Sequence, residues 1–188
     1  MSFLGPLTNF LLYLRGRASL DVEMDLDASK VERTDAGNRL YIRLRVTNQG
    51  PAVAKNAQVT VSDLRIREAP AKWRSIALMS PQLVWTSTRD STRRETLATY
   101  PPRTVDLAAL DTDRAWLQIS PAPLSEVHVL ERGASYCFSV TVSADNGEPT
   151  HRTRHFVFVI PHASGGAAED RVDLLSGDMR VERCPGFW

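Results

Sequence analysis

The sequence has few lysines, few cysteines and no long apolar run. Only Lys30, Lys55 and Lys72 are lysines among its 23 basic residues, and 22 acidic residues leave a formal net charge of +1. Because positive and negative charges nearly cancel, the sequence argues against a protein that binds nucleic acid mainly through phosphate contacts. No stretch reaches the roughly 18 apolar residues of a membrane-spanning helix. The hydrophobic and charged fractions, 43% and 24%, are those of an ordinary globular protein.

Two cysteines are too few for a disulfide framework. Cys137 lies in a predicted strand and Cys184 lies close to the C-terminus. Residues 1–14 have neither the basic region nor the small-residue cleavage site of a secretory signal. We therefore expect a cytoplasmic protein with both thiols reduced. A chain of 188 residues can bury a sufficient core without a disulfide or a metal.

One helix is expected, over residues 3–16. Pro6 suits its first turn and Gly16 suits its C-terminal cap. Its apolar residues recur at the spacing of one helix face, and further leucines widen that face beyond what a surface helix needs. We therefore assign residues 1–18 to an amphipathic N-terminal helix that needs a hydrophobic surface to lie on. The apolar face consists of Phe3, Leu7, Phe10, Leu11 and Leu14.

Alternating apolar and polar residues predict strands through most of the remaining chain. Asn146-Gly147 between the last two of these runs predicts a hairpin turn. Many short strands with a single helix indicate an all-β fold, an antiparallel sandwich of the immunoglobulin-like kind. The expected strands cover residues 20–27, 40–47, 57–61, 82–86, 104–107, 116–119, 136–142 and 156–160.

The predicted domain covers residues 19–160 and contains one long connection. Residues 65–102 are rich in Arg, Ser, Thr and Pro, with Trp73, Trp85 and Tyr100 as aromatic anchors. The Leu83-Val84-Trp85 run is typical of a core strand. Residues 161–188 are expected to form a C-terminal tail, because a Ser-Gly-Gly joint lies near their start.

Opposite charges line the outward faces of the first two predicted strands. Acidic residues alternate along 21–27 and basic residues along 39–45, so antiparallel pairing would place the two sets side by side. The alternative is a calcium or cationic-partner site on the acidic set. Carboxylates spaced along a strand diverge, however, whereas calcium needs six to eight converging oxygens. The acidic set is Asp21, Glu23, Asp25 and Asp27.

A tyrosine corner is predicted at Leu130, Gly133 and Tyr136. In this device a buried Tyr near the start of a late strand makes a hydrogen bond to the backbone upstream. The buried phenol needs a partner, and the arch needs Gly where the chain turns. Tyr136 also precedes Phe138, Val140 and Val142 on the same strand face.

Residues 46–50 (Val-Thr-Asn-Gln-Gly) and 54–61 (Ala-Lys-Asn-Ala-Gln-Val-Thr-Val) resemble the signature of bacterial immunoglobulin-like modules. The sequence is most similar to the cell-adhesion-related domain found in bacteria (CARDB), over about residues 19–160. The resemblance implies that the Asn and Gly shape a hairpin and that residues 54–61 begin the next strand. Such modules are generally non-catalytic spacers or binding domains, so it implies no active site.

No arrangement of residues indicates catalysis. The sequence has no G-x-S-x-G turn, no phosphate-binding Gly-rich loop, no CxxC pair and no HExxH helix. His151 and His155 would share a strand face at roughly 13 Å, too far apart for one metal. We therefore expect no catalytic, cofactor-binding or metal-binding residues. A site formed by His155, His162 and Cys184 would require the tail to fold back.

Two sets of residues are candidates for binding. A basic set interleaved with Trp73 and Trp85 could contact nucleic acid or an acidic protein, although solvated loops would show the same pattern. The apolar helix face and the C-terminal Phe187-Trp188 could dock a partner, a second copy of the chain or a membrane, or could pack on the domain itself. The basic set is Arg65, Arg67, Arg74, Arg89, Arg93 and Arg94.

A non-enzymatic protein-interaction module is the function that the sequence favours. It would present sandwich loops or an edge strand, with the N-terminal helix docking a protein partner or a second copy. The alternatives are a nucleic-acid-binding accessory protein that uses residues 65–94 and a peripheral membrane protein anchored by residues 3–14.

Overall fold

The computed structural model describes eight stretches of the chain. They are residues 16–34, 37–70, 72–76, 81–86, 95–111, 115–120, 129–147 and 152–160. The predicted N-terminal helix, apart from Gly16, and the predicted tail at 161–188 lie outside them. The proposed division of the chain near residues 18 and 160 therefore stays a prediction.

The described residues form strands joined by turns and irregular segments. All pairings between these strands are antiparallel, which confirms the predicted all-β class. The strands are β1 (Leu20–Thr34), β2 (Gly37–Asn48), β3 (Ala54–Ala69), β4 (Lys72–Ile76), β5 (Gln82–Trp85), β6 (Glu95–Leu97), β7 (Arg103–Leu110), β8 (Ala115–Leu117), β9 (Ile119–Ser120), β10 (Val129–Leu130), β11 (Ser135–Ser143) and β12 (Arg152–Val159).

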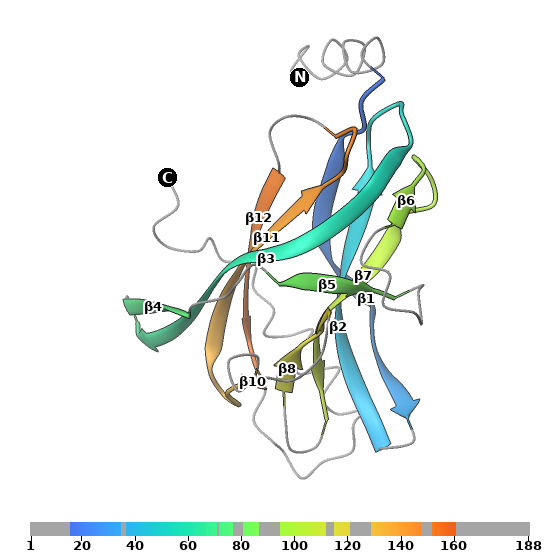
Figure 1. Ribbon diagram of the computed structural model, residues 1–188. Helices are drawn as coiled ribbons and strands as arrows, with labels where there is room; N and C mark the ends of the chain where they lie inside the picture. Colours follow the sequence, from blue (N-terminus) through green and yellow to red (C-terminus); the bar gives the residue numbers. More distant parts are fainter. Residues whose placement is uncertain are drawn as a thin grey trace, which may run out of the picture.

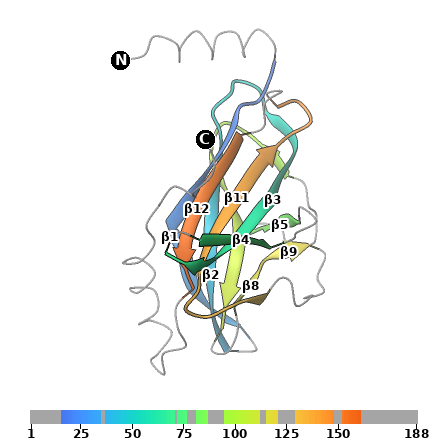
Figure 2. The same ribbon diagram turned by 90° about the vertical axis from the view of Figure 1, so that its left-hand side faces the viewer.

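Hydrogen bonds join these strands into one sheet, in the order β1-β2-β7-β5-β3-β11-β12 along its main path. β5 is a narrow link, because it pairs with β3 only at Gln82 and with β7 only at Val84 and Trp85. Strands β12, β11 and β3 lie in front of β1 and β2 in Figure 2. The first and last strands lie side by side, since Arg154 of β12 donates to both carboxylate oxygens of Asp21 on β1 (2.8 and 2.7 Å). The sheet therefore nearly closes on itself (Figure 1).

Alternate residues of the long strands point inward and form a single main core. The inward side chains of β2 and β11 are fully buried or nearly so, and they belong to one cluster with those of β3 and β7. Burying each large apolar side chain contributes about 1.5–3 kcal/mol. Trp85 on β5 belongs to this cluster, as its sequence context predicted. The β2 and β11 contributors are Leu40, Ile42, Leu44, Val46, Tyr136, Phe138, Val140 and Val142.

The tyrosine corner is present. The buried Tyr136 hydroxyl accepts a 2.7 Å hydrogen bond from the backbone N–H of Glu131. Gly133 lies between them at a φ of +76°, where a Cβ would be strained. Burial raises the pKa of Tyr136. The Leu-Gly-Tyr spacing therefore identified a real backbone arch.

The charged strands pair as predicted but extend further. β1 and β2 are antiparallel, with Glu23 opposite Arg45 and Asp25 opposite Arg43. β1 continues to Thr34, through an irregularity between Asp25 and Lys30 that alternation did not reveal. In the described parts of the predicted connection at 65–102, β5 (Gln82–Trp85) matches the expected strand, whereas the extension of β3 to Ala69 and strands β4 and β6 were not predicted. The predicted strand at 116–119 is divided at Gln118 into β8 and β9.

Candidate interaction surface

Asn48, the last residue of β2, is buried and binds three neighbouring segments. Its Oδ1 accepts hydrogen bonds from the backbone N–H groups of Ser19 (3.3 Å) and Gly50 (3.0 Å). Its Nδ2 donates to the backbone carbonyls of Ala52 (2.7 Å) and Leu97 (3.1 Å). Both donors and both lone pairs of this amide are therefore used. Asn48 fixes the loop after β2 against the incoming chain and against β6.

Gly50 allows that loop to lie directly on the incoming chain. A Cβ at this position would lie 2.5 Å from the backbone nitrogen of Ser19 and 2.9 Å from the carbonyl oxygen of Arg17. Only a residue without a side chain allows so close an approach between two backbones. Gln49 adds a hydrogen bond from its N–H to the Ser19 carbonyl (2.7 Å). The Asn and Gly of the hairpin motif thus both act on residues 17–19.

Asn146 plays the matching role in the turn after β11. Its Nδ2 donates to the carbonyl of Val53 (2.9 Å), and its Oδ1 accepts from the N–H of Lys55 (2.8 Å). Its own backbone carbonyl accepts from the N–H of Ala18 (3.0 Å). The predicted turn residue therefore also joins β3 and the incoming chain to the end of β11.

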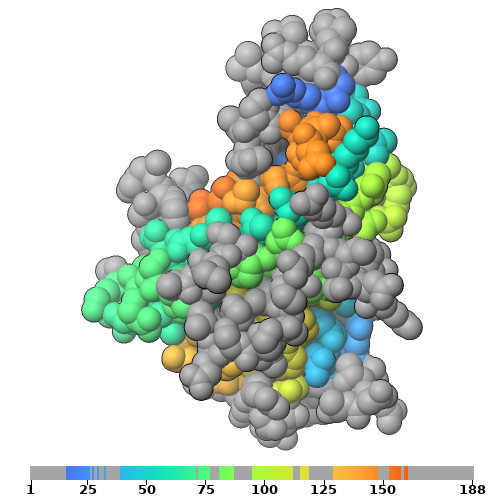
Figure 3. Space-filling view, viewed as in Figure 1, coloured from blue at the N-terminus to red at the C-terminus, as the bar shows by residue number. Residues whose placement is uncertain are grey.

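These contacts place four segments together at one end of the molecule, which we call the N-terminal rim. It consists of residues 16–19, 49–56, 95–103 and 144–147. Thr99 closes it by donating to the Gly50 carbonyl (3.2 Å). Figure 3 shows the four segments at the upper end of the surface. Residues 1–15 precede Gly16 directly, so the N-terminal segment leaves the described fold at this rim.

The rim exposes apolar side chains that the core does not use. Three large apolar side chains are exposed among the described residues, and two of them belong to the rim: Val53 (48%) and Tyr100 (82%). The third, Val129 (45%), lies on β10 at the opposite end (Figure 1). Because Asn48 and Asn146 fix the loops beneath them, Val53 and Tyr100 stand on a rigid support, the usual arrangement for binding loops.

The charges of the rim are mixed, with cations in slight excess. Lys55 and Arg103 are exposed and Arg17 is half-buried. Glu95 is half-buried, and Asp145 accepts a 2.6 Å hydrogen bond from Nδ2 of Asn56. Asn56 has a φ of +52°, a conformation that asparagine tolerates better than most residues.

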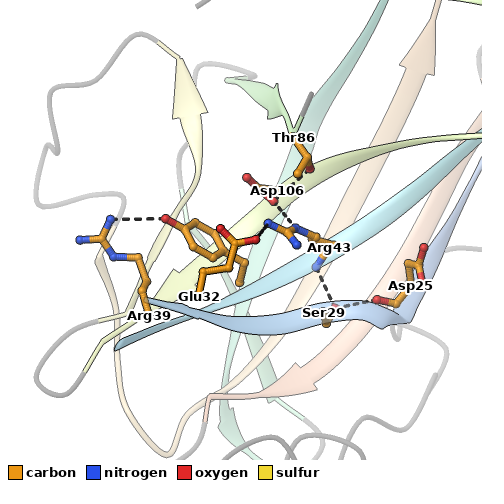
Figure 4. Close-up of polar contacts among 8 residues, drawn as sticks. Asp25, Ser29, Glu32, Arg39, Arg43, Thr86 and Asp106 are labelled. Atoms are coloured by element: carbon orange, nitrogen blue, oxygen red, sulfur yellow. Dashed lines mark hydrogen bonds and ion pairs between the residues drawn. The ribbon is translucent and has the colours of Figure 1, made fainter. Parts of the chain in front are cut away.

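A second polar cluster, centred on Arg43, lies on the outer face of β1, β2 and β7 (Figure 4). The Arg43 side chain is only 5% exposed, and it binds Asp106 through Nε (2.8 Å) and Glu32 through Nη2 (2.7 Å). Thr86 donates a further hydrogen bond to Asp106 (3.2 Å). The guanidinium also lies 5.3 Å from the Tyr41 ring centroid. This arrangement pairs a buried cation with two carboxylates.

Two irregularities in strand pairing create the Arg43 cluster. β1 shifts register between Asp25 and Lys30, and β7 shifts register opposite Ile42 and Arg43. The Ser29 side chain bridges the two strands where their backbone pairing is interrupted. Its Oγ donates to the Asp25 carbonyl (2.7 Å) and accepts from the N–H of Arg43 (3.0 Å). Such bulges re-aim side chains along a strand.

Burial and pairing act in opposite directions on the pKa values of Arg43 and Asp106. Burial lowers the pKa of Arg43, but the hydrogen bonds to Asp106 and Glu32 outweigh it and raise that pKa overall. Burial raises the pKa of Asp106 more than the Arg43 hydrogen bond lowers it. The pair is ionised, because the guanidinium of Arg43 lies 2.8 Å from the Asp106 carboxylate and stabilises its negative charge.

The outer face of β3, β11 and β12 carries a third polar group. The buried Ser139 hydroxyl is 2.9 Å from Nδ1 of His155, its cross-strand neighbour. Burial lowers the pKa of His155, and Arg65 lowers it further. Asp63, opposite Ser139 on β3, binds Arg65 (2.7 Å) and Ser75 (2.9 Å). Within the described stretches no three His, Cys, Asp or Glu residues are grouped so that they could hold a metal.

Cys137 corrects the prediction of two reduced thiols. It lies on the same outer face, buried beside Val157 and Trp73, and it is disulfide-bonded. The sequence contains one other cysteine, Cys184, which lies outside the described residues. Spacing along a sequence does not indicate whether two cysteines meet, because a disulfide depends on the distance and direction of their Cβ atoms. The prediction was therefore wrong.

The predicted partner-binding residues are not located by the structure. Phe3, Leu7, Phe10, Leu11, Leu14, Phe187 and Trp188 lie outside the described residues, as do Arg89, Arg93 and Arg94 of the basic set.

The three basic-set residues that are described lie near or on the β3–β4 hairpin. Arg65 binds Asp63 (2.7 Å) and Arg74 binds Glu68 (2.6 Å). Arg67 donates to the Pro70 carbonyl and lies 5.8 Å from the Trp73 ring centroid. Two of the three cations are thus paired with carboxylates.

The sequence did not single out the exposed residues of the rim. The sequence predicts Tyr100 as an aromatic anchor of the connection at 65–102 and indicates no role for Val53. Both residues lie in turn-rich segments, near Pro51 and between Thr99 and Pro101, which is the signal that the sequence offers. Asn48 and Asn146 are residues typical of turns, but this does not predict their contacts to distant segments.

Comparisons with known proteins add no identification. No protein-family model, no curated protein and no solved structure matches the chain. In the stretches that the structure describes, no helix is long and apolar enough to cross a membrane.

Proposed function

We propose that this chain is a non-enzymatic binding module that contacts its partner through the N-terminal rim, together with residues 3–14. One observation carries the proposal. Of the three large apolar side chains exposed among the described residues, two stand on rim loops that buried or half-buried asparagines hold in place. Exposed aromatic residues on a rigid support are frequent anchors of binding surfaces.

The loops of the rim are better candidates than an edge strand. β1 and β12 are the two ends of the main path of the sheet, and Asp21 and Arg154 hold them together. A strand partner would have to separate them. The nucleic-acid alternative is less well supported, because Arg65 and Arg74 are paired with carboxylates.

The finer description of the fold as an immunoglobulin-like sandwich similar to CARDB also stays a proposal. The tyrosine corner at Tyr136 and the hairpin made by Asn48 and Gly50 support it. The cytoplasmic location predicted from the sequence rested on the lack of a secretory-signal pattern, and it implied two reduced thiols. The disulfide at Cys137 instead supports an oxidising compartment.

A pair of surface variants tests the proposed function. The full chain, Val53→Ser/Tyr100→Ser and the control Val129→Ser are each tagged and produced in the native host. The share of each protein recovered in larger complexes or with membranes is then measured. We expect the rim variant to lose most of that share and Val129→Ser, at the opposite end, to keep it. Equal recovery of all three proteins would exclude the rim as the binding surface.

A further inference from the structure

The N-terminal rim contains the cations that have no partner within the described stretches. The side chains of Arg17, Lys55 and Arg103 form no hydrogen bond and no ion pair there. The other lysine and arginine side chains that the structure describes bind a carboxylate, a carbonyl or a hydroxyl. Those that bind carboxylates are Arg43, Arg45, Arg65, Lys72, Arg74 and Arg154. In the described fold, the positive charge available to a partner is therefore concentrated at the rim.

The two exposed cations of the rim each lie near an exposed apolar side chain of their own segment. Val53 and Lys55 are two positions apart at the start of β3, and Ala54 between them is fully buried. Residues two positions apart in an extended segment point to the same side, so Val53 and Lys55 face outward together. Tyr100, 82% exposed, precedes the exposed Arg103 in the loop before β7. The rim thus presents an apolar group and a cation twice.

Hydrogen bonds hold both segments in place before any partner arrives. Asn146 binds the carbonyl of Val53 (2.9 Å) and the N–H of Lys55 (2.8 Å). Thr99, next to Tyr100, donates to the Gly50 carbonyl (3.2 Å). A partner therefore meets loops that are already ordered, which lowers the entropy lost on binding.

The charges of the rim favour a partner with carboxylates. Its cations are Arg17, Lys55 and Arg103, and its carboxylates are Glu95 and Asp145. Glu95 is half-buried, and Asp145 already accepts a hydrogen bond. One excess charge is too little for nucleic acid, which binds by matching several phosphates. A second copy of the rim would carry the same excess, and like charges across an interface are unfavourable.

We infer that the partner of the N-terminal rim is an acidic protein segment that also carries apolar side chains. Its carboxylates bind Lys55 and Arg103, and its apolar groups cover Val53 and Tyr100. Hydrogen bonds between ionised groups supply orientation, and the buried aromatic ring supplies most of the affinity. This inference rests on the proposed function, because it identifies what the same surface binds.

A defined peptide tests the inference on the full chain. The probe is a labelled synthetic peptide of Glu, Phe and Ser, and the control peptide has Lys in place of every Glu. We expect only the acidic peptide to bind, with an affinity that falls as salt is added. Lys55→Gln and Arg103→Gln should each weaken binding about threefold, the effect of one exposed ion pair. Tyr100→Ser should weaken it about tenfold, because an aromatic anchor is lost. Fluorescence anisotropy measures these affinities.

The matched control variant is Arg67→Gln on the β3–β4 hairpin. It removes an exposed cation away from the rim, one that donates to the Pro70 carbonyl. The affinity for the acidic peptide should stay unchanged. Thermal unfolding of every variant shows whether it is folded, so that a loss of binding is not a loss of structure.

A carbodiimide cross-link locates the contact, because this reagent joins a lysine amine to a carboxylate that touches it. Lys72 binds Glu68 at 2.9 Å and provides the internal positive control. We expect the bound acidic peptide to be joined to Lys55. Lys55→Arg keeps the charge but removes the amine, so this variant should keep the affinity and lose the cross-link.

Several results would overturn the inference. If the acidic peptide binds no more tightly than the basic one, or if Lys55→Gln and Arg103→Gln keep full affinity, the rim does not select an acidic segment. If the peptide does not bind and the chain floats with vesicles of phosphatidylcholine and phosphatidylglycerol, the occupant is an anionic membrane. The proposed function fails separately, because it requires Val53→Ser/Tyr100→Ser to free the chain from host complexes whichever probe binds.

Discussion

The N-terminal rim and the Arg43 cluster both fix segments that are distant in sequence, but they use different chemistry. In the rim, neutral amides bind backbone groups: Asn48 reaches residues 19, 50, 52 and 97. In the Arg43 cluster, a cation with a 5% exposed side chain binds two carboxylates. The rim leaves apolar side chains in water, whereas the cluster buries its cation against carboxylates.

The difference favours the rim over the Arg43 cluster as the binding surface of the proposed function. A buried ion pair needs all of its charges matched, so any ligand that competed for Arg43 would leave Asp106 or Glu32 uncompensated. In the rim, the asparagine amides and the backbone groups satisfy one another's hydrogen bonds beneath the loops. The outer surface of the loops can therefore contact a partner. The rim is therefore the better candidate for function, and the Arg43 cluster is a structural feature of the sheet.

Removing the charge of Arg43 is expected to have the largest effect on stability. Arg43→Met leaves Asp106, whose side chain is 13% exposed, without its partner and should lower the free energy of unfolding by about 3 kcal/mol. Chemical denaturation measures this loss. The double variant Arg43→Met/Asp106→Asn should recover much of it, because no buried charge then remains uncompensated.

Arg74 on β4 provides the exposed control for Arg43. Its side chain is 55% exposed, and it binds Glu68, 33% exposed, at 2.6 Å. Arg74→Met should change the free energy of unfolding little, since an ion pair between exposed side chains contributes little to stability. Equal losses for the two arginines would show that the burial of Arg43 is not what makes it important.

Removing the Asn48 amide should have a smaller effect. Asn48→Ala leaves two N–H groups and two carbonyls without their partner, but loops at the end of the molecule can admit water. We expect a loss of about 2 kcal/mol in the free energy of unfolding. Thr96→Ala, an exposed β6 neighbour of Leu97, should change it little. A larger loss for Asn48→Ala than for Arg43→Met would reverse the comparison between the two clusters.

Sequence reasoning recognised the parts of these clusters that depend on neighbouring residues. The turn-forming residue types of Asn48, Gly50 and Asn146 indicated the turns in which they lie, where Asn48 binds Gly50 and Gly147 binds Ala144. Alternation placed Arg43 on the outward face of its strand and predicted the antiparallel pairing of β1 with β2. The tyrosine corner was found for the same reason, since Tyr136 binds a residue only a few positions upstream.

Other features depend on contacts that no local pattern records. Arg43 lies opposite Asp25, yet its charge partners are Asp106 and Glu32, because irregular pairing in β1 and β7 moves those carboxylates toward it. The Asn48 contact to Leu97 spans two segments far apart in the chain. The exposure of Tyr100 likewise depends on how β6 and β7 place the loop between them.

His155 offers the smallest and most specific test, because histidine is the side chain whose ordinary pKa lies nearest to neutral pH. Its pKa is lowered in the folded protein, mainly by burial, with Arg65 adding to the effect, while Asp63 opposes it and Ser139 holds Nδ1. A histidine whose folded pKa is depressed contributes stability above its unfolded pKa of about 6.5 and loses it as the pH falls through the folded pKa. The free energy of unfolding should therefore decrease on acidification below about pH 6.5. His155→Gln should flatten that decrease, as measured by denaturation at several pH values, whereas Thr96→Ala, an exposed and uncharged site, should leave its slope between pH 5 and 7 unchanged. A slope that persists in His155→Gln would assign the titration to another group.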